Sequence, residues 1–597
     1  MKKPRTADIV NKALIIAGIL IAGTLLRLYS LESDPPDYFP WSETACIDEG
    51  CGMLDARNVV KYASDYRPPG DEYQGHANDS RLMYELQLFI FENFGMKVIN
   101  LRYMTVWISE IIIAIMLITL AFFFKGRMVF LTGLALSINV VYYFHSKVAL
   151  YELSMLVLGT ALMPPLFAFL GQRVSTHKPF RPGYAVLIVV LIGLFTAAGM
   201  NIKESFLIYL SSILIAFFFA ATIPYFREKR RCPSWVQPDR LFIYGLALIG
   251  LVSVALYVWG GDRCVDKPLM LLGKMWFLEI IYLQPNTFLF AVLSCLAMMK
   301  LLFNKKYIHY SREDLLEYQI DIYFTMQFIF SFLFAYLAVR GQLRYFLFSE
   351  LSIIYLAARF AGNHGSEMKI LARRSLRKRG IMGSFMAFLL VLYMSLQVVI
   401  FFMMLFMDFE NRRLIMNNFY LNISQGNLGD KHVQIVFIMA FLLVSLAYYF
   451  ARRFDDVVYF IQRRASGKLM VFLLIQIQLI YLLSWQYNKT FAIREAMNFV
   501  NTLPADCVII GDWAPMIALE SDLKIIYSNL REPENMKSIA GLDPDYVVVN
   551  SVRKEEAAYN SCVPGLIKPE NSIYSFKVQS FDIKIYKVDK KPKAGGT

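Results

Sequence analysis

Apolar residues gather in long runs along most of the chain, and polar residues fall in the gaps between them. A helix needs about 20 mostly apolar residues to cross the hydrocarbon core of a bilayer. The pattern predicts thirteen such spans, at residues 12–31, 104–124, 128–145, 150–170, 184–200, 204–224, 241–260, 276–303, 319–339, 344–361, 381–407, 432–450 and 468–486. We therefore expect a polytopic α-helical membrane protein.

The polar stretch at residues 32–103 is too long to be a simple turn between the first two spans. It contains two segments, 53–63 and 82–94, whose apolar residues recur at helical spacing on one face. Amphipathic helices beside a first span lie naturally on the membrane surface. We expect a large first outside loop that holds its polar groups near the lipid headgroups.

Residues 487–590, after the last span, have the pattern of a small soluble α/β domain. Apolar residues at 493–503 recur at helical spacing. Short runs typical of strands follow at 507–510, 524–527, 546–549, 575–578 and 583–588. The last residues, 591–597, read as a disordered tail.

Composition and charge narrow the class of protein. Hydrophobic residues make up 57% of the chain and charged residues only 18%, which excludes an ordinary soluble protein and a disordered one. The net charge is +14, and Lys and Arg are enriched at the N-terminus and in alternate loops, which hold 28 of them against 9 in the five short loops on the other side. This distribution indicates membrane topology and no nucleic-acid partner. It predicts a multi-pass membrane protein with a cytoplasmic N-terminus and a C-terminal domain on the outside. We expect the inner (plasma) membrane of a bacterium, with that domain in the periplasm, and the endoplasmic reticulum is the alternative.

An acidic pair, Asp48 and Glu49, stands in the first outside loop. A carboxylate near the headgroups is partly desolvated, which raises its pKa and its basicity. Such a group can accept the proton of a hydroxyl as that hydroxyl attacks. The alternative is a solvated loop pair or a helix N-terminal cap, because adjacent acidic residues are common.

The run from Leu25 to Asn58, LLRLYSLESDPPDYFPWSETACIDEGCGMLDARN, resembles the first span and first outside loop of the GT-C glycosyltransferases. It is most similar to the branch of protein mannosyltransferases and lipid A aminoarabinose transferases, which often carry DEG followed closely by ARN. Further similarities follow in the same order: YFHSKVALYE at 143–152, NIKE at 201–204, QLRYF at 342–346 and GDWAP at 511–515.

The resemblance implies a GT-C-like catalytic domain at residues 1–486 and an enzyme that moves a sugar from a polyprenyl-phosphate donor. The acceptor would be a hydroxyl of a glycan, a lipid or a protein on the periplasmic face, with inversion at the sugar carbon. Asp48 matches the catalytic base, and Glu49 would orient the acceptor. The residues expected to bind the donor phosphate are Arg344, Lys203 and Lys147. The residues expected to bind the acceptor or to be structural are Glu152, Arg57 and Asn58.

Some of these residues could instead have purely structural roles. Arg344 and Lys147 could simply snorkel or lock a loop, and Lys203 could form a weak ion pair with Glu204. Asp48, Glu49 and Glu152 could offer oxygens to a divalent ion, but the resemblance does not call for one, so we expect no metal and no other cofactor.

Two cysteine pairings and two other functions also remain open. Cys46 could bond to Cys51 around the acidic pair, and Cys507 to Cys562 in the C-terminal domain. A transporter or flippase would need charged or broken helices near the bilayer midplane, whereas most charges here stand at span ends. A polysaccharide polymerase or ligase would usually place its large outside loop late in the chain.

Overall fold

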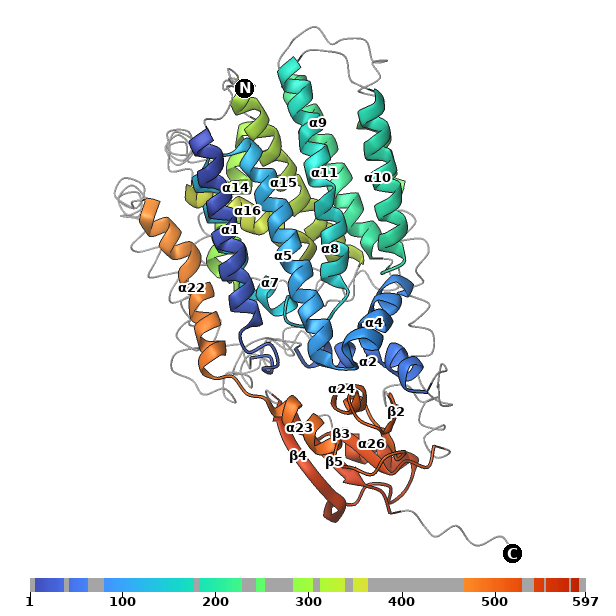
Figure 1. Ribbon diagram of the computed structural model, residues 1–597. Coiled ribbons are helices and arrows are strands. Elements are labelled where there is room, and N and C mark those ends of the chain that lie inside the picture. The colour runs from blue at the N-terminus through green and yellow to red at the C-terminus, as the bar shows by residue number, and fades with distance from the viewer. Residues whose placement is uncertain are drawn as a thin grey trace, which may run out of the picture.

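The structure is a computed structural model. It describes residues 6–36, 42–62, 80–176, 182–203, 205–227, 243–252, 283–303, 312–338, 347–362, 467–528, 542–551, 555–578 and 581–589. Within these residues the chain forms a helical bundle, and a smaller mixed α/β unit lies at one end of it (Figure 1). The first helix begins at the opposite end of the bundle from that unit.

The bundle is built from helices that follow the apolar runs of the sequence. They are α1 (Thr6–Leu28), α5 (Val98–Phe123), α6 (Gly126–Ile138), α7 (Val140–His145), α8 (Glu152–Ala161), α9 (Met163–Thr176), α10 (Pro182–Met200), α11 (Phe206–Arg227), α14 (Pro285–Phe303), α15 (Arg312–Ala338), α16 (Leu347–Gly362) and α22 (Gly467–Tyr487). In the described part of the chain, 5 helices are long and apolar enough to cross a membrane. The helices of the bundle bury apolar side chains against one another in one continuous core.

Two expected spans are interrupted. The span expected at 128–145 consists of two helices, α6 and α7, which meet at Asn139, so neither crosses a bilayer as one straight helix. The span expected at 150–170 is interrupted only by a turn at Leu162, between α8 and α9, and Glu152–Gln172 as a whole remains long and apolar enough to cross a membrane. The spans expected at 381–407 and 432–450 lie outside the described residues.

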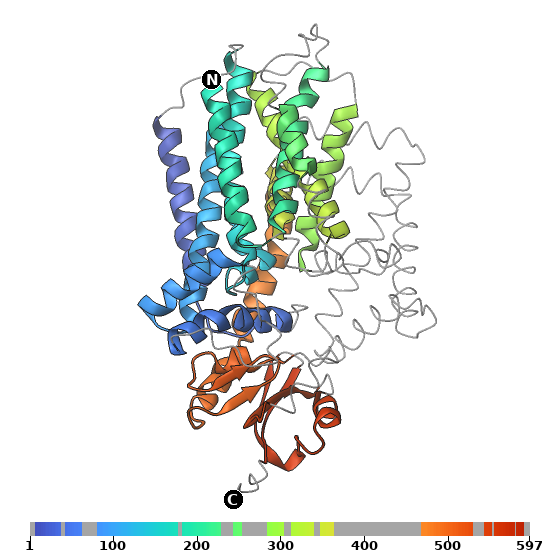
Figure 2. The ribbon, with the colours of Figure 1, turned by 90° about the vertical axis from the view of Figure 1, so that its right-hand side faces the viewer.

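The first outside loop forms two helices, α2 (Ser42–Tyr62) and α4 (Arg81–Phe94), which lie across the end of the bundle (Figure 2). The prediction of helices here is confirmed, but α2 begins at Ser42 and so includes the acidic pair. Figure 1 shows α2 between the bundle and the C-terminal unit. The helix is therefore enclosed by protein on two sides instead of lying open on the membrane surface.

The C-terminal unit contains a five-stranded sheet of order β2-β1-β3-β5-β4. Its elements are α23 (Ala492–Val500), β1 (Val508–Ile510), α24 (Ala514–Ala518), β2 (Lys524–Ile526), β3 (Tyr546–Asn550), α26 (Glu555–Cys562), β4 (Ser572–Val578) and β5 (Phe581–Lys587). Strand β1 pairs in parallel with β2 and β3, and the pairs β3–β5 and β5–β4 are antiparallel. All five expected strands are present, because their alternating apolar residues fill the cores on the two faces of the sheet.

One hydrophobic core joins the first loop to the C-terminal unit. Ile47 and Met53 of α2 pack in the same cluster as Trp513 and Ile517, which lie more than 450 residues later in the chain. Residues of α4 and of the start of α5 complete the cluster. The helix that carries the acidic pair is thus part of the core of the C-terminal unit, which is why it is held firmly at the end of the bundle.

Candidate active site

The two acidic neighbours of α2 have different surroundings, because consecutive residues point about 100° apart around a helix. The Glu49 carboxylate is 1% exposed and is held by Arg102 of α5 through two hydrogen bonds, of 2.9 Å to Nε and 2.7 Å to Nη2. The backbone N–H of Ala149 also donates to it, at 2.8 Å. Glu49 therefore joins α2 to α5 and to the turn before α8.

Asp48 is half-buried on a different face of α2, which it shares with Asp55, two turns further along the helix. Between them, the backbone oxygen of Gly52 accepts a hydrogen bond of 3.1 Å from the hydroxyl of Tyr151. Asp48 and Asp55 stand about one turn to either side of Gly52 on α2, and Glu152 follows Tyr151 directly in the chain. Three carboxylates therefore lie close enough to one tyrosine to act on it electrostatically.

A lysine lies beside this acidic group. The Nζ of Lys203, in the turn between α10 and α11, lies 3.4 Å from Oε1 of Glu152 at the start of α8. Lys203 remains 29% exposed, whereas Glu152 is almost fully buried. The start of α4 is tied to the same turn, because the hydroxyl of Ser80 donates to the carbonyl of Ile202. We take Asp48, Asp55, Tyr151, Glu152 and Lys203 as the candidate active site.

The structure places Lys147 elsewhere. Its ammonium is 2% exposed and donates to the backbone carbonyls of Tyr29, at 3.1 Å, and Ser30, at 2.8 Å. It also lies 5.3 Å from the ring of Tyr143 and 5.0 Å from the ring of Trp485. These contacts lock the end of α1 to α7 and α22. Arg344, the other cation expected to bind phosphate, lies outside the described residues.

Lys147 makes the stability of the protein depend on pH. Burial, followed by the charges of Arg102 and Lys489, lowers the pKa of Lys147 from 10.5 to about 7. Between these values the unfolded chain holds a proton that the folded protein has lost, so stability rises with pH across this window, and below it the penalty is present in full. We expect the melting temperature in neutral detergent to rise from pH 7 to about pH 9, and Lys147→Met to remove part of that rise. An identical pH profile in the variant would contradict this prediction.

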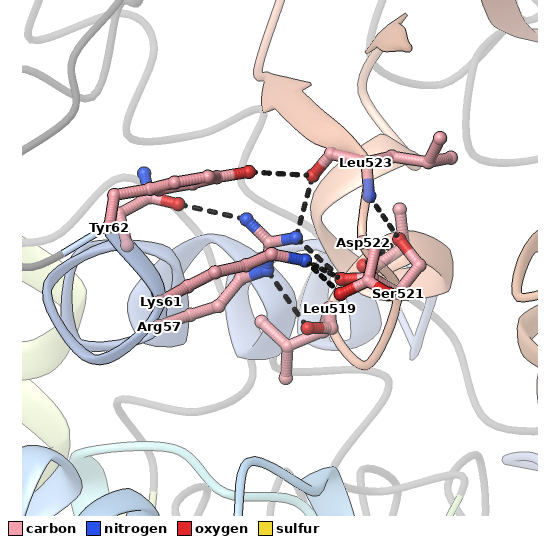
Figure 3. Close-up of polar contacts among 9 residues, drawn as sticks. Arg57, Lys61, Tyr62, Leu519, Ser521, Asp522 and Leu523 are labelled. Carbon is pink, nitrogen blue, oxygen red and sulfur yellow. Dashed lines mark hydrogen bonds and ion pairs between the residues drawn. The ribbon is translucent and has the colours of Figure 1, made fainter. Parts of the chain in front are cut away.

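Arg57 anchors α2 to the C-terminal unit. The guanidinium is 0% exposed and donates to the backbone carbonyls of Leu519, Ser521 and Leu523, at 2.9, 2.9 and 2.7 Å (Figure 3). It donates also to the side-chain oxygen of Asn58, at 2.9 Å. These bonds satisfy carbonyls in the segment that leads from α24 to β2, so Arg57 and Asn58 are structural in this arrangement.

The next turn of α2 strengthens the same contact. Lys61 reaches the carboxylate of Asp522 at 2.6 Å and the carbonyl of Ser521 at 2.7 Å, and the hydroxyl of Tyr62 donates to the carbonyl of Leu523 at 3.2 Å (Figure 3). The Asp522 carboxylate is 79% exposed, so the ion pair itself contributes little. The buried bonds of Arg57 carry most of the attachment.

Gly50, next to the acidic pair, lies directly against the backbone of α24. A Cβ atom at this position would lie 2.5 Å from the backbone nitrogen of Met516 and 2.9 Å from the carbonyl carbon of Pro515. Only glycine allows the two helices to come this close. The DEG and GDWAP sequences, far apart in the chain, therefore meet in space.

We expect Gly50→Ala to destabilise the protein by about 1–3 kcal/mol, because the added methyl group displaces α24 from α2. Gly18→Ala is the matched control, since nothing lies within 4 Å of the added methyl group and alanine favours the helix. Melting temperatures of both variants in detergent would check this. Equal melting temperatures would show that the two helices are not in contact at Gly50.

The cysteines do not form the pairs that were considered from the sequence. The structure joins neither Cys46 to Cys51 nor Cys507 to Cys562. Cys46 and Cys51 are five residues apart on one helix, so their side chains point about 140° apart. Among the described residues, no three His, Cys, Asp or Glu side chains gather closely enough to hold a metal ion.

Arg102, Asp55 and Tyr151 were not singled out from the sequence. Arg102 lies at the start of the second expected span, where a charged residue usually has a partner of opposite charge. Its position therefore predicts an ion pair, but it does not identify Glu49 as the partner. Asp48 and Asp55 are seven residues apart and so share one face of a helix, but this would have been evident only if the predicted helix had included Asp48. Tyr151 carried no such signal.

No family model matches the sequence, and no curated protein does. Among solved structures, the chain is similar to the crystal structure of ArnT from Cupriavidus metallidurans in the apo state. The sequences are 12% identical, the TM-score is 0.45, and the match covers 96% of this chain and 97% of that chain. A similarity at this level assigns no chemistry to the residues of this chain.

Proposed function

We propose that this protein is a membrane glycosyltransferase that moves a sugar from a polyprenyl-phosphate donor to a hydroxyl acceptor on the periplasmic face. The observation that carries the proposal is the placement of Asp48. It is a half-buried carboxylate on a helix fixed between an apolar bundle and a soluble unit, with the lysine of the Glu152–Lys203 pair in the same site. A lipid-linked donor and a water-borne acceptor can both reach such a boundary.

In this proposal Asp48 is the general base. The acceptor oxygen attacks the anomeric carbon as the bond from that carbon to the phosphate oxygen breaks, and the hydroxyl proton moves to the Asp48 carboxylate. Attack from the face opposite the phosphate inverts the sugar carbon. Polyprenyl phosphate leaves with the electron pair of the broken bond, and Lys203 stabilises the charge that develops on it. Glu152 would keep the Lys203 ammonium aimed into the site.

The remaining expected site residues take other roles in the proposal. Arg344 is retained as a second phosphate ligand on the strength of the sequence resemblance alone. Glu49 becomes a positioning residue, because Arg102 already occupies both of its carboxylate oxygens. Lys147 is assigned to the structural contact with Tyr29 and Ser30 instead of to the donor phosphate.

The direct test uses the purified full-length protein in lipid nanodiscs with synthetic polyprenyl-phosphate sugars and a panel of hydroxyl acceptors. Mass spectrometry of the products should show a sugar added to one acceptor class and free polyprenyl phosphate in equal amount. Comparison of envelope glycans and glycoproteins in cells with and without the gene should identify the acceptor. If no sugar is transferred from any donor and the envelope is unchanged, the proposal is wrong.

A flippase for lipid-linked sugars is the second candidate, favoured by a polar cluster at the break between α6 and α7. Asn139 donates to the buried carboxylate of Glu350 at 2.7 Å, and Gln284 donates to the same carboxylate at 2.8 Å. Broken helices with polar partners inside a bundle are typical of transporters. Movement of a fluorescent polyprenyl-phosphate sugar across proteoliposomes, without chemical transfer, would favour this candidate over the enzyme.

A further inference from the structure

The turn that follows α1 is held in a conformation that is unfavourable for its sequence. Ser30 has φ of +52°, in the left-handed region that favours glycine. A non-glycine residue persists there only when its surroundings hold it, and such residues are frequent at binding sites. Two lysines hold this turn.

The inner lysine is Lys147, whose ammonium binds the backbone carbonyls of Tyr29 and Ser30. The outer one is Lys489, in the segment after α22. Its ammonium donates to the hydroxyl oxygen of Tyr29 and to that of Ser30, both at 3.0 Å. The two lysines therefore approach the same two residues, one through the backbone and one through the side chains.

The two hydrogen bonds from Lys489 leave one N–H of its ammonium and the hydroxyl protons of Tyr29 and Ser30 outside these bonds. Because the hydroxyl oxygens of Tyr29 and Ser30 accept from the ammonium, their own protons must point elsewhere. The ammonium has three N–H groups, of which two are used in these bonds. One N–H of Lys489 and the hydroxyl groups of Tyr29 and Ser30 can therefore still donate to a bound group, and a phosphate oxygen accepts from donors of this kind.

The charge around this turn favours an anion. Within the described residues, Lys489 forms no ion pair with a carboxylate, whereas Arg102 nearby is neutralised by Glu49. The Asp34 carboxylate, in the same region, is used by Thr490 and by two backbone N–H groups at the start of α23.

The surroundings of the turn indicate a lipid. Leu25 and Tyr29 at the end of α1 are 64% and 55% exposed, and Tyr487 at the end of α22 is 89% exposed. Further apolar side chains are exposed along both helices, including Ile21 and Leu483. Exposed tyrosines where apolar helices end are typical of the membrane–water interface. Figure 1 shows the ends of α1 and α22 on the same side of the bundle.

We propose that Lys489, Tyr29 and Ser30 form a binding site for the phosphate of an anionic phospholipid, with the acyl chains along the exposed faces of α1 and α22. This inference does not rest on the proposed sugar transfer, because none of the three residues belongs to the candidate active site. The lipid would join the last membrane helix to the first at the level where the C-terminal unit begins.

The test is native mass spectrometry of the full-length protein, delipidated in a neutral detergent and titrated with dioleoylphosphatidylglycerol. We expect Lys489→Gln to weaken binding about tenfold and Tyr29→Phe about threefold, because a charged donor contributes more than a neutral one. Lys97→Gln, which changes an exposed lysine in the turn before α5, is the matched control and should bind as the unaltered protein does.

Two further titrations distinguish the sources of phosphate. Dioleoylglycerol has the same chains without phosphate and should not occupy the site, and millimolar inorganic phosphate should not displace the phospholipid. Equal binding by Lys489→Gln, Tyr29→Phe and the unaltered protein would overturn the proposal, and so would occupancy by dioleoylglycerol or displacement by inorganic phosphate. Tyr29→Phe keeps the aromatic ring, so it serves as the decisive variant if Lys489→Gln does not fold.

Discussion

Asp48→Asn is expected to lower the rate of sugar transfer by about a thousandfold while leaving the melting temperature almost unchanged, because a general base contributes about 10²–10⁴-fold to the rate of such a step. Asparagine has the shape of aspartate but cannot accept the acceptor's proton at neutral pH. Asp48 is half-buried, and Glu49 and Arg57 supply the ion pair and hydrogen bonds that hold α2 in place. Loss of the carboxylate charge should therefore affect chemistry and not folding.

The measurement is single-turnover transfer from a polyprenyl-phosphate sugar in nanodiscs, with the melting temperature recorded on the same preparation. Donor binding, measured separately, should remain close to that of the unaltered protein, because Asp48 does not contact the lipid phosphate in the proposed mechanism. Unchanged turnover by Asp48→Asn would remove Asp48 from the role of base. A lower melting temperature with a lower rate would instead indicate a structural role.

Glu49→Gln, in contrast to Asp48→Asn, is expected to lower the stability of the fold, by about 3–5 kcal/mol, because it leaves the buried guanidinium of Arg102 without its counter-charge. The pair has side-chain exposures of 7% for Arg102 and 0% for Glu49, so water cannot replace the lost partner. Both variants replace a carboxylate with the corresponding amide, and the two positions are adjacent in the chain. Comparing the two variants therefore separates the catalytic requirement from the structural one.

The melting temperature in detergent provides the measurement, and a double variant provides the control. Glu49→Leu with Arg102→Leu removes both charges together and should recover much of the stability lost in Glu49→Gln, since two apolar residues leave no buried charge behind. If Glu49→Gln melts at the temperature of Asp48→Asn, the ion pair does not hold α2 in place. The second, structural anchor at Arg57 would then have to do so alone.

The amphipathic spacing at 82–94 predicted α4 well, because apolar residues at helical spacing need a surface on which to pack. The same reasoning placed the first helix at 53–63, whereas α2 begins at Ser42. Gly50 and Gly52 disfavour a helix by their own conformational freedom, so the sequence around the acidic pair resembles a loop. Burial of Ile47 in the shared core outweighs that preference, and this information lies in residues more than 450 positions away.

The acidic pair itself was visible in the sequence, but the difference between its members was not. Which carboxylate lies in the site depends on the position of Arg102, which a reading of local sequence does not give. Arg57 was identified from its motif, yet its partners are backbone carbonyls at 519–523, and no pattern of side chains indicates them. The interruption at Asn139 was missed because the apolar run continues across it without a proline or a glycine.

The contact between Gly50 and Met516 has a consequence for how the protein is made. During synthesis α2 leaves the ribosome hundreds of residues before α24. The helix that bears Asp48 therefore lacks its packing partner until α24 has been made. Pairing across such a distance in the chain is slow. If the proposed function holds, activity therefore requires that the final hundred residues have been made and have folded, and a ribosome that stops early would release an inert protein.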